Sequence, residues 1–163
     1  MKSVLRKSER QHLLVALATT FLLGVAGCDE TAAIKQWVAK VEPLRVKAVG
    51  EISSVPYQAA QHQVFKNYFA EIGGTALRLV QDNDFATAFN KAIAKTDLKD
   101  ACVRVFMERR DWEAIRDHCL RNGLFICAEE VRVYPDLVAS IRSRLVPEQQ
   151  RRFDAVPECE RAL

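Results

Sequence analysis

The sequence predicts an all-α protein, either a compact helical bundle or an array of helical hairpins. From residue 30 onward, apolar residues recur three and four positions apart along most of the chain, the spacing that places them on one face of a helix. Short β-branched runs such as VRV at 131–133 lie inside this periodicity and lack hairpin turns. Four cysteines fall in the last 62 residues, so the C-terminal half is the part expected to carry disulfides.

The composition of the first 27 residues indicates a segment separate from this helical domain. Residues 1–12 carry four basic side chains and one acidic one, and residues 13–27 form an uncharged apolar run of 15 residues. A helix that spans a bilayer needs about 20 apolar residues. A basic start, a short apolar run and small residues at its end predict a cleaved signal peptide, with a retained anchor helix as the alternative.

The end of this run points to a particular class of exported protein. Val25-Ala26-Gly27-Cys28 resembles the lipobox of bacterial lipoproteins. The resemblance implies that Cys28 receives a diacylglyceryl group, that the leader is cut just before it, and that the new amino terminus is acylated, for example with palmitate. Asp29 is similar to the inner-membrane retention signal of such proteins. These features imply a lipid-anchored protein of the bacterial envelope that faces the periplasm, with the inner membrane slightly favoured.

Removing residues 1–27 changes the charge of the chain. The full sequence is +3, whereas residues 28–163 contain 20 basic and 20 acidic side chains. A neutral chain lacks the clustered basic surface that nucleic-acid binding requires, so no nucleic-acid partner is expected. The 136 residues from Cys28 onward suffice for one domain of ordinary size.

The helices of residues 28–95 are predicted as follows. Residues 30–44 form the first, through Ile34, Trp37, Val38 and Val41, and Pro43 should end or kink it. Residues 51–57 are expected to be a loop, with Pro56 opening the next helix. That helix buries Ala60, Val64, Phe65, Tyr68, Phe69 and Ile72, and Gly73-Gly74 should end it before a shorter piece at 75–81. Residues 82–95 form another, with Asp84 as its cap and Phe85, Ala88, Phe89, Ala92 and Ile93 on its apolar face.

The rest of the chain divides at its charged and glycine-containing stretches. Helical segments are expected at 96–110, 111–122, 124–134 and 135–145, with a short one at 147–153. From residue 96 the basic residues are one lysine and eleven arginines. This composition favours a salt-bridged helical surface, and an arginine-rich face for an acidic or anionic partner is the alternative.

The four C-terminal cysteines predict two disulfides, because export places them in an oxidising compartment. Three connectivities are possible. We favour Cys119–Cys127, since the two lie symmetrically about Gly123, where Asn122-Gly123 is typical of a helix end. Cys102–Cys159 then follows by elimination. A zinc site is the alternative, but no C-x-x-C pair is present.

One segment resembles a known repeat. Residues 101–123, with Asp111-Trp112-Glu113-Ala114-Ile115 at a helix start, look like a tetratricopeptide or Sel1-like helical hairpin, which implies a protein-binding scaffold. Trp112, with Arg109 and Arg110 before it, is the candidate partner-binding group, and a core position for Trp112 is the favoured alternative.

These observations leave two functions open. The first is a non-enzymatic lipoprotein that binds other envelope proteins, as an accessory factor of an envelope, secretion or conjugation assembly. The second is a periplasmic enzyme or ligand-binding protein that acts on cell-wall glycan or a small anionic ligand. No G-x-S-x-G, H-E-x-x-H or phosphate-binding loop occurs in the sequence. The first function is therefore favoured, with no catalytic residue, no metal and no cofactor besides the lipid on Cys28.

Overall fold

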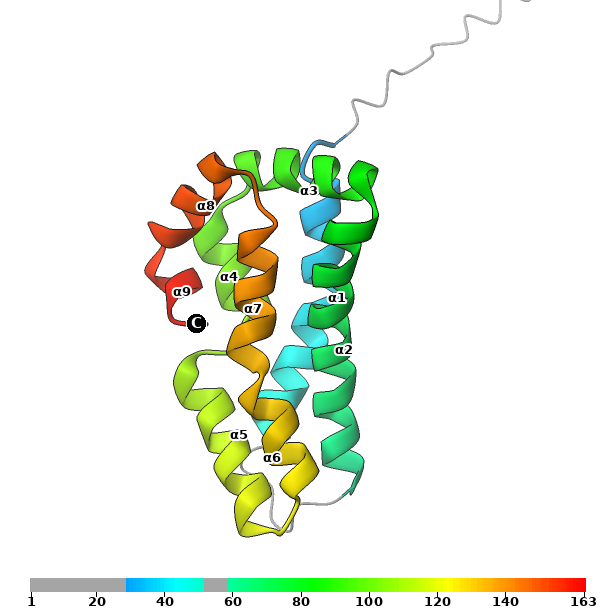
Figure 1. The fold of residues 1–163 in the computed structure, drawn as a ribbon, viewed down its shortest axis with the longest axis vertical. Coiled ribbons are helices and arrows are strands. Elements are labelled where there is room, and N and C mark those ends of the chain that lie inside the picture. The colour runs from blue at the N-terminus through cyan, green and yellow to red at the C-terminus, as the bar shows by residue number, and fades with distance from the viewer. Residues whose placement is uncertain (1–28, 52–58) are drawn as a thin grey trace, which may run out of the picture.

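A computed structural model describes residues 29–51 and 59–163, and this part of the chain is helical without strands. The predicted all-α class is therefore confirmed. Figure 1 shows the arrangement of the helices. Their bounds are α1 Ala32–Gly50, α2 Ala59–Gln81, α3 Asn83–Lys95, α4 Leu98–Val105, α5 Arg109–Arg121, α6 Phe125–Arg132, α7 Tyr134–Ser143, α8 Pro147–Asp154 and α9 Pro157–Glu160.

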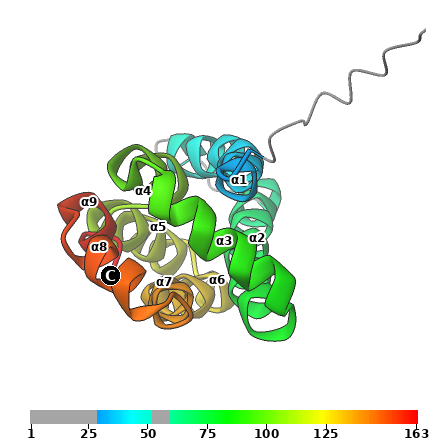
Figure 2. The same cartoon turned by 90° about the horizontal axis from the view of Figure 1, so that it is seen from above.

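The long helices run along one axis, so the molecule has two distinct ends. α1 begins at the end where the chain enters from residue 29, and α2 runs back toward that end beside it (Figure 1). Figure 2 shows α3 crossing this end of the bundle. We call it the entry end, defined by Asp29, Thr31 and α3. The opposite end holds the turn between α5 and α6, residues 120–126, which we call the tip.

Buried apolar side chains from α1 to α9 form one continuous core. Tyr68 of α2 and Tyr134 of α7 lie fully buried inside it, with 2.9 Å between their hydroxyl oxygens. The Tyr68 hydroxyl also lies 2.9 Å from the Val105 carbonyl oxygen, and the backbone N–H of Met107 donates to the Tyr134 hydroxyl at 2.7 Å. This network satisfies the polar groups where the chain leaves α4, which would otherwise be buried without partners.

Both predicted disulfides are confirmed. Cys102–Cys159 joins α4 to α9, and Cys119–Cys127 joins α5 to α6. Their sequence separations are 57 and 8 residues, so the first ties the C-terminal helix to a helix far from it in the sequence. The second closes the tip.

Two predicted helix ends within the first half of the chain are wrong. α1 continues past Pro43 to Gly50, and α2 continues through Gly73 and Gly74 to Gln81. Each glycine costs a helix interior only about 1 kcal/mol relative to alanine. Burial beyond the expected breaks favours continuation of both helices, since Ala48 of α1 and Ala76 and Leu79 of α2 lie in the core.

Two further boundaries also differ. Asp82, not Asp84, caps α3, because its carboxylate accepts the backbone N–H of Phe85 at 2.8 Å. The helix predicted for 96–110 ends at Val105, where Phe106 turns extended and enters the core. Arg109 and Arg110 therefore open α5 instead of closing α4.

Candidate functional site

The predicted lipidation site, Cys28, lies outside the described residues, but Asp29 beside it is described. The Asp29 carboxylate accepts hydrogen bonds from the Lys35 ammonium at 2.7 Å, from the Thr31 hydroxyl at 2.6 Å and from the Thr31 backbone N–H at 3.0 Å. The hydrogen bond from Lys35, followed by those from Thr31, lowers the pKa of Asp29 from 3.8 to about 2. Asp29 is therefore ionised and held against the first turn of α1.

The three residues predicted to bind a partner, Trp112, Arg109 and Arg110, do not form one surface. Trp112 is only 6% exposed and belongs to the core, which is the alternative that the sequence favoured. Arg109 and Arg110 remain exposed at the start of α5 and pair with the carboxylates of Glu113, at 2.9 Å, and Glu108, at 3.1 Å. Because the indole of Trp112 is buried, it cannot serve as an exposed anchor for a partner.

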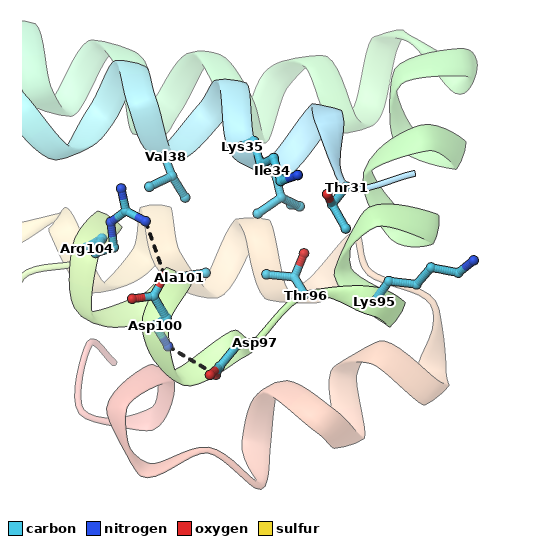
Figure 3. A pocket seen from close by; sticks show the side chains of 10 residues that line it. All are labelled: Thr31, Ile34, Lys35, Val38, Lys95, Thr96, Asp97, Asp100, Ala101 and Arg104. Atoms are coloured by element: carbon cyan, nitrogen blue, oxygen red, sulfur yellow. Dashed lines mark hydrogen bonds and ion pairs between the residues drawn. The ribbon is translucent and has the colours of Figure 1, made fainter. Parts of the chain in front are cut away.

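A cleft of about 330 Å³ with several charged side chains lies at the entry end between α1 and α4 (Figure 3). Lys35, Lys95 and Arg104 line it, and in Figure 3 Lys95 extends outward, away from the other side chains. Each of these cations already has a carboxylate partner: Lys35 pairs with Asp29, Lys95 with Glu30, and Arg104 with Glu42 and Asp100. A small anion would have to displace these carboxylates, so the cleft does not favour an anionic ligand.

A larger cleft of about 440 Å³ lies at the tip. One wall is formed by the start of α6 and the other by His62 and Lys66 of α2. Phe125 and Ile126 are 69% and 74% exposed, and Leu120 nearby is also exposed. Large apolar side chains at such exposure, side by side on a turn, are typical of an interaction surface.

The local sequence explains why the tip has this form. Gly123 adopts a positive φ of 71°, so the chain turns there, and Leu124 N–H donates to the Cys119 carbonyl at 2.8 Å. α6 then buries Cys127, Ala128 and Val131 at helical spacing. Phe125 and Ile126 lie on its other face and remain exposed.

A second cleft of about 270 Å³ adjoins the first and shares Lys66 with it. Phe69, Val133 and Leu137 provide its apolar lining, and Glu130 provides a carboxylate. The Glu130 carboxylate lies 3.3 Å from His62 Nε2 and 3.7 Å from Lys66 Nζ. These contacts link α2 to α6 where the two clefts meet.

This site was not among those predicted from the sequence. Its signal in the sequence is the run Leu124-Phe125-Ile126 at the start of a short helix. Three successive apolar residues point in different directions around a helix, so one narrow buried face cannot take all of them. The periodicity alone could not show which of them stays exposed.

No known protein family matches this chain, and no curated protein and no solved structure matches it either. Among the described helices, none is both long and apolar enough to cross a membrane. Within residues 29–51 and 59–163, no group of three or more His, Cys, Asp and Glu side chains is arranged to hold a metal ion.

Proposed function

We propose that this protein is a lipid-anchored envelope protein that acts without catalysis, by holding another envelope protein at its tip. The observation that carries the proposal is the exposed apolar pair Phe125 and Ile126 at the end of the bundle opposite the entry end (Figure 1). Exposed apolar side chains that lie side by side on a surface mark sites of interaction with other proteins.

The tip lies at the end of the bundle opposite the predicted lipid anchor, which supports the proposed role in holding a partner. Only residues 29–31 separate Cys28 from α1, so a lipid on Cys28 would hold the entry end close to the bilayer. α1 has 19 residues, which corresponds to about 28 Å of helix at 1.5 Å per residue. The tip would therefore point into the periplasm, where it can meet a partner. If Asp29 retains the protein as its resemblance implies, that periplasmic face belongs to the inner membrane.

The tip is tested by photocrosslinking in the native cells. A photoreactive amino acid replaces Phe125 in one strain and Val103 of α4 in another; both positions are exposed, but Val103 lies outside the tip. The expected result is a discrete crosslinked envelope protein from position 125 and none of that species from position 103. Equal crosslinking from both positions, or none from position 125, contradicts the proposal.

The anchor is tested separately with Cys28→Ala. The expected product keeps its leader, takes up no radiolabelled palmitate and migrates as the unprocessed chain. A Cys28→Ala protein that still appears in its shortened, lipid-labelled form contradicts the assignment of Cys28. Asp29→Ala, which keeps the cysteine, is the matched control and should remain processed and labelled.

A further inference from the structure

The outward face of α2 carries an uncharged stripe with the spacing of a coiled coil. Six exposed positions follow one another at intervals of four, three, four, three and four residues, and we call them the α2 stripe: Gln63, Asn67, Ala70, Gly74, Leu77 and Gln81. Contact positions in a two-stranded coiled coil alternate in this way. α2 packs against α1, α3 and α7, and none of these helices covers the stripe, since all six residues are exposed.

Gly74, in the middle of the stripe, has no explanation among the described residues of its own chain. A glycine inside a helix is destabilising relative to alanine. Gly123 needs its glycine for a positive φ, but Gly74 does not have a positive φ. An added Cβ at Gly74 would meet nothing within 4 Å, so packing within the chain does not require a glycine either. A residue without a side chain does let the backbone of a second helix approach closely.

The stripe is able to contact a second copy of itself in register. It carries no charge that would repel its own copy, and Leu77, which is 54% exposed, would meet an apolar side chain. The amide of Asn67 contains both donors and an acceptor, so two copies can hydrogen-bond to each other. The Gln63 amide already donates to the Asn67 carbonyl oxygen at 2.8 Å. An asparagine at one contact position is a known means of fixing the register of a two-stranded coiled coil.

The charges on the two edges of the stripe are opposite. Lys66 lies on the edge toward α6, 3.7 Å from Glu130, and Glu71 lies on the edge toward α1, 2.7 Å from Lys40. When two copies of α2 run parallel, Lys66 of one faces Glu71 of the other, five residues further along. An ammonium has three donors and a carboxylate accepts several hydrogen bonds. The new contact therefore extends the two existing pairs and displaces neither.

The remaining charge beside the stripe does not oppose this arrangement. Arg78 lies on the same edge as Glu71, pairs with Asp82 at 3.4 Å, and has its guanidinium 3.8 Å from the centre of the Phe85 ring. In the parallel arrangement the position that faces it, five residues earlier in the second copy, is the uncharged Gly73. No like charges therefore meet along the stripe.

We infer that α2 pairs in parallel with α2 of a second copy, so that the protein forms a weak homodimer at the membrane. The inference goes beyond the proposed function and takes from it only the anchor. Two copies held at the entry end by one bilayer meet with their α2 helices parallel, because an antiparallel pair would point one anchor away from the bilayer. Confinement to one surface raises the effective concentration of the copies, so the limited contact of one helix of 23 residues suffices. The dimer presents two tips on the same side.

Disulfide trapping tests the contact. Asn67→Cys is expressed in the native cells, the membranes are oxidised mildly, and the dimer is measured on a non-reducing gel. Arg151→Cys is the matched control, since Arg151 is exposed on α8, across the bundle from α2 (Figure 2). Position 67 should give at least about tenfold more dimer than position 151, because only two copies of position 67 come within the Cα distance of a disulfide. Gln63→Cys, one turn away on the stripe, should give the same result. Equal yields from the stripe and from position 151 overturn the dimer.

A mixed experiment tests the orientation. Asn67→Cys and Gln81→Cys are expressed together in copies that carry tags of different mass. Both positions lie seven residues from Gly74, so an antiparallel pair centred on Gly74 would join position 67 to position 81. The parallel pair joins 67 to 67 and 81 to 81. A 67–81 product as the main species overturns the inference.

Charge exchange gives an independent readout. Lys66→Glu alone and Glu71→Lys alone each place like charges opposite each other at two symmetry-related contacts. Each should lower the dimer yield from position 67 about fivefold, since two weak surface pairs change at once. The double exchange should restore the yield. Within one chain the double exchange disrupts the pairs with Glu130 and Lys40 together, so a purely intrachain role predicts a double variant worse than either single one. That result overturns the contact between copies.

The dimer and the proposed function fail separately. If positions 63 and 67 give no more dimer than position 151 while position 125 still captures an envelope protein, the dimer is overturned and the adaptor function stands. If position 67 forms the disulfide but position 125 captures nothing, the adaptor function is overturned and the dimer stands.

Discussion

The two disulfides should stabilise the protein unequally, because they close loops of very different length. In the chain-entropy description, a cross-link removes conformational entropy from the unfolded chain by a constant plus an amount that grows with the logarithm of loop length. The separation of 57 residues for Cys102–Cys159 then corresponds to about 4.2 kcal/mol. The separation of 8 residues for Cys119–Cys127 corresponds to about 2.5 kcal/mol. Replacing the first pair by alanine should therefore cost about 1.7 kcal/mol more free energy of unfolding than replacing the second.

The comparison controls for packing, because all four cysteines are buried and each variant removes two sulfur atoms from the core. The two double-alanine variants and the wild-type protein are unfolded in urea and followed by far-ultraviolet circular dichroism. The free energies are compared only if all three transitions are single and share one denaturant dependence. Equal losses, or a larger loss from the Cys119–Cys127 pair, would refute the loop-length argument. The dominant contribution would then be local packing at the tip.

Three other perturbations have expected outcomes. Gly74→Ala should raise the free energy of unfolding by about 0.5–1 kcal/mol in the same assay, because an added Cβ meets nothing within 4 Å. Tyr134→Phe should lower it by about 1–3 kcal/mol, since it leaves the buried N–H of Met107 without its acceptor. The Asp29 carboxyl, followed by nuclear magnetic resonance, should titrate near pH 2, and Lys35→Gln should move its midpoint toward 3.8. Because this pKa is lowered on folding, the contribution of Asp29 to stability is complete above pH 3.8 and is lost as the pH falls through about 2.

The sequence was sufficient for the helical class and for the faces that pack inward. Ile34, Val38 and Val41 share a face by spacing alone, and all three are buried. The Cys119–Cys127 disulfide was equally predictable, because two cysteines on either side of a glycine turn can meet only across a hairpin. In both cases the deciding information is local, so a pattern within about ten residues is enough.

The misplaced helix ends have the opposite cause. Pro43 and the pair Gly73-Gly74 are local signals for a break, and local propensity is all that a single sequence displays. The free energy that overrides them comes from packing between distant segments. An added Cβ on Gly73, for example, would lie 3.8 Å from Leu137 of α7. Such a contact joins parts of the chain that no local pattern relates, so the continuation of α2 could not be predicted.

The same limit explains why Trp112 was considered as an anchor while Phe125 was overlooked. Both are large aromatic residues near a helix start, and the sequence distinguishes them only by their neighbours. Trp112 shares its face with Ile115 and Cys119, and the core covers that face. Phe125 lies on the side of α6 away from its buried residues, and only α6's contacts with α5 and α7 reveal this.

The Cys119–Cys127 bond accounts for how an exposed tip can keep a fixed shape. Phe125 and Ile126 bury little of their surface, so the hydrophobic effect contributes little to holding the start of α6 in place. The covalent bond fixes the chain next to them, because Cys127 is the residue after Ile126 and is itself buried. A surface ordered in advance loses less conformational freedom when a partner binds. The Cys119–Cys127 disulfide, which holds the tip in shape, is therefore also expected to strengthen the binding of a partner there.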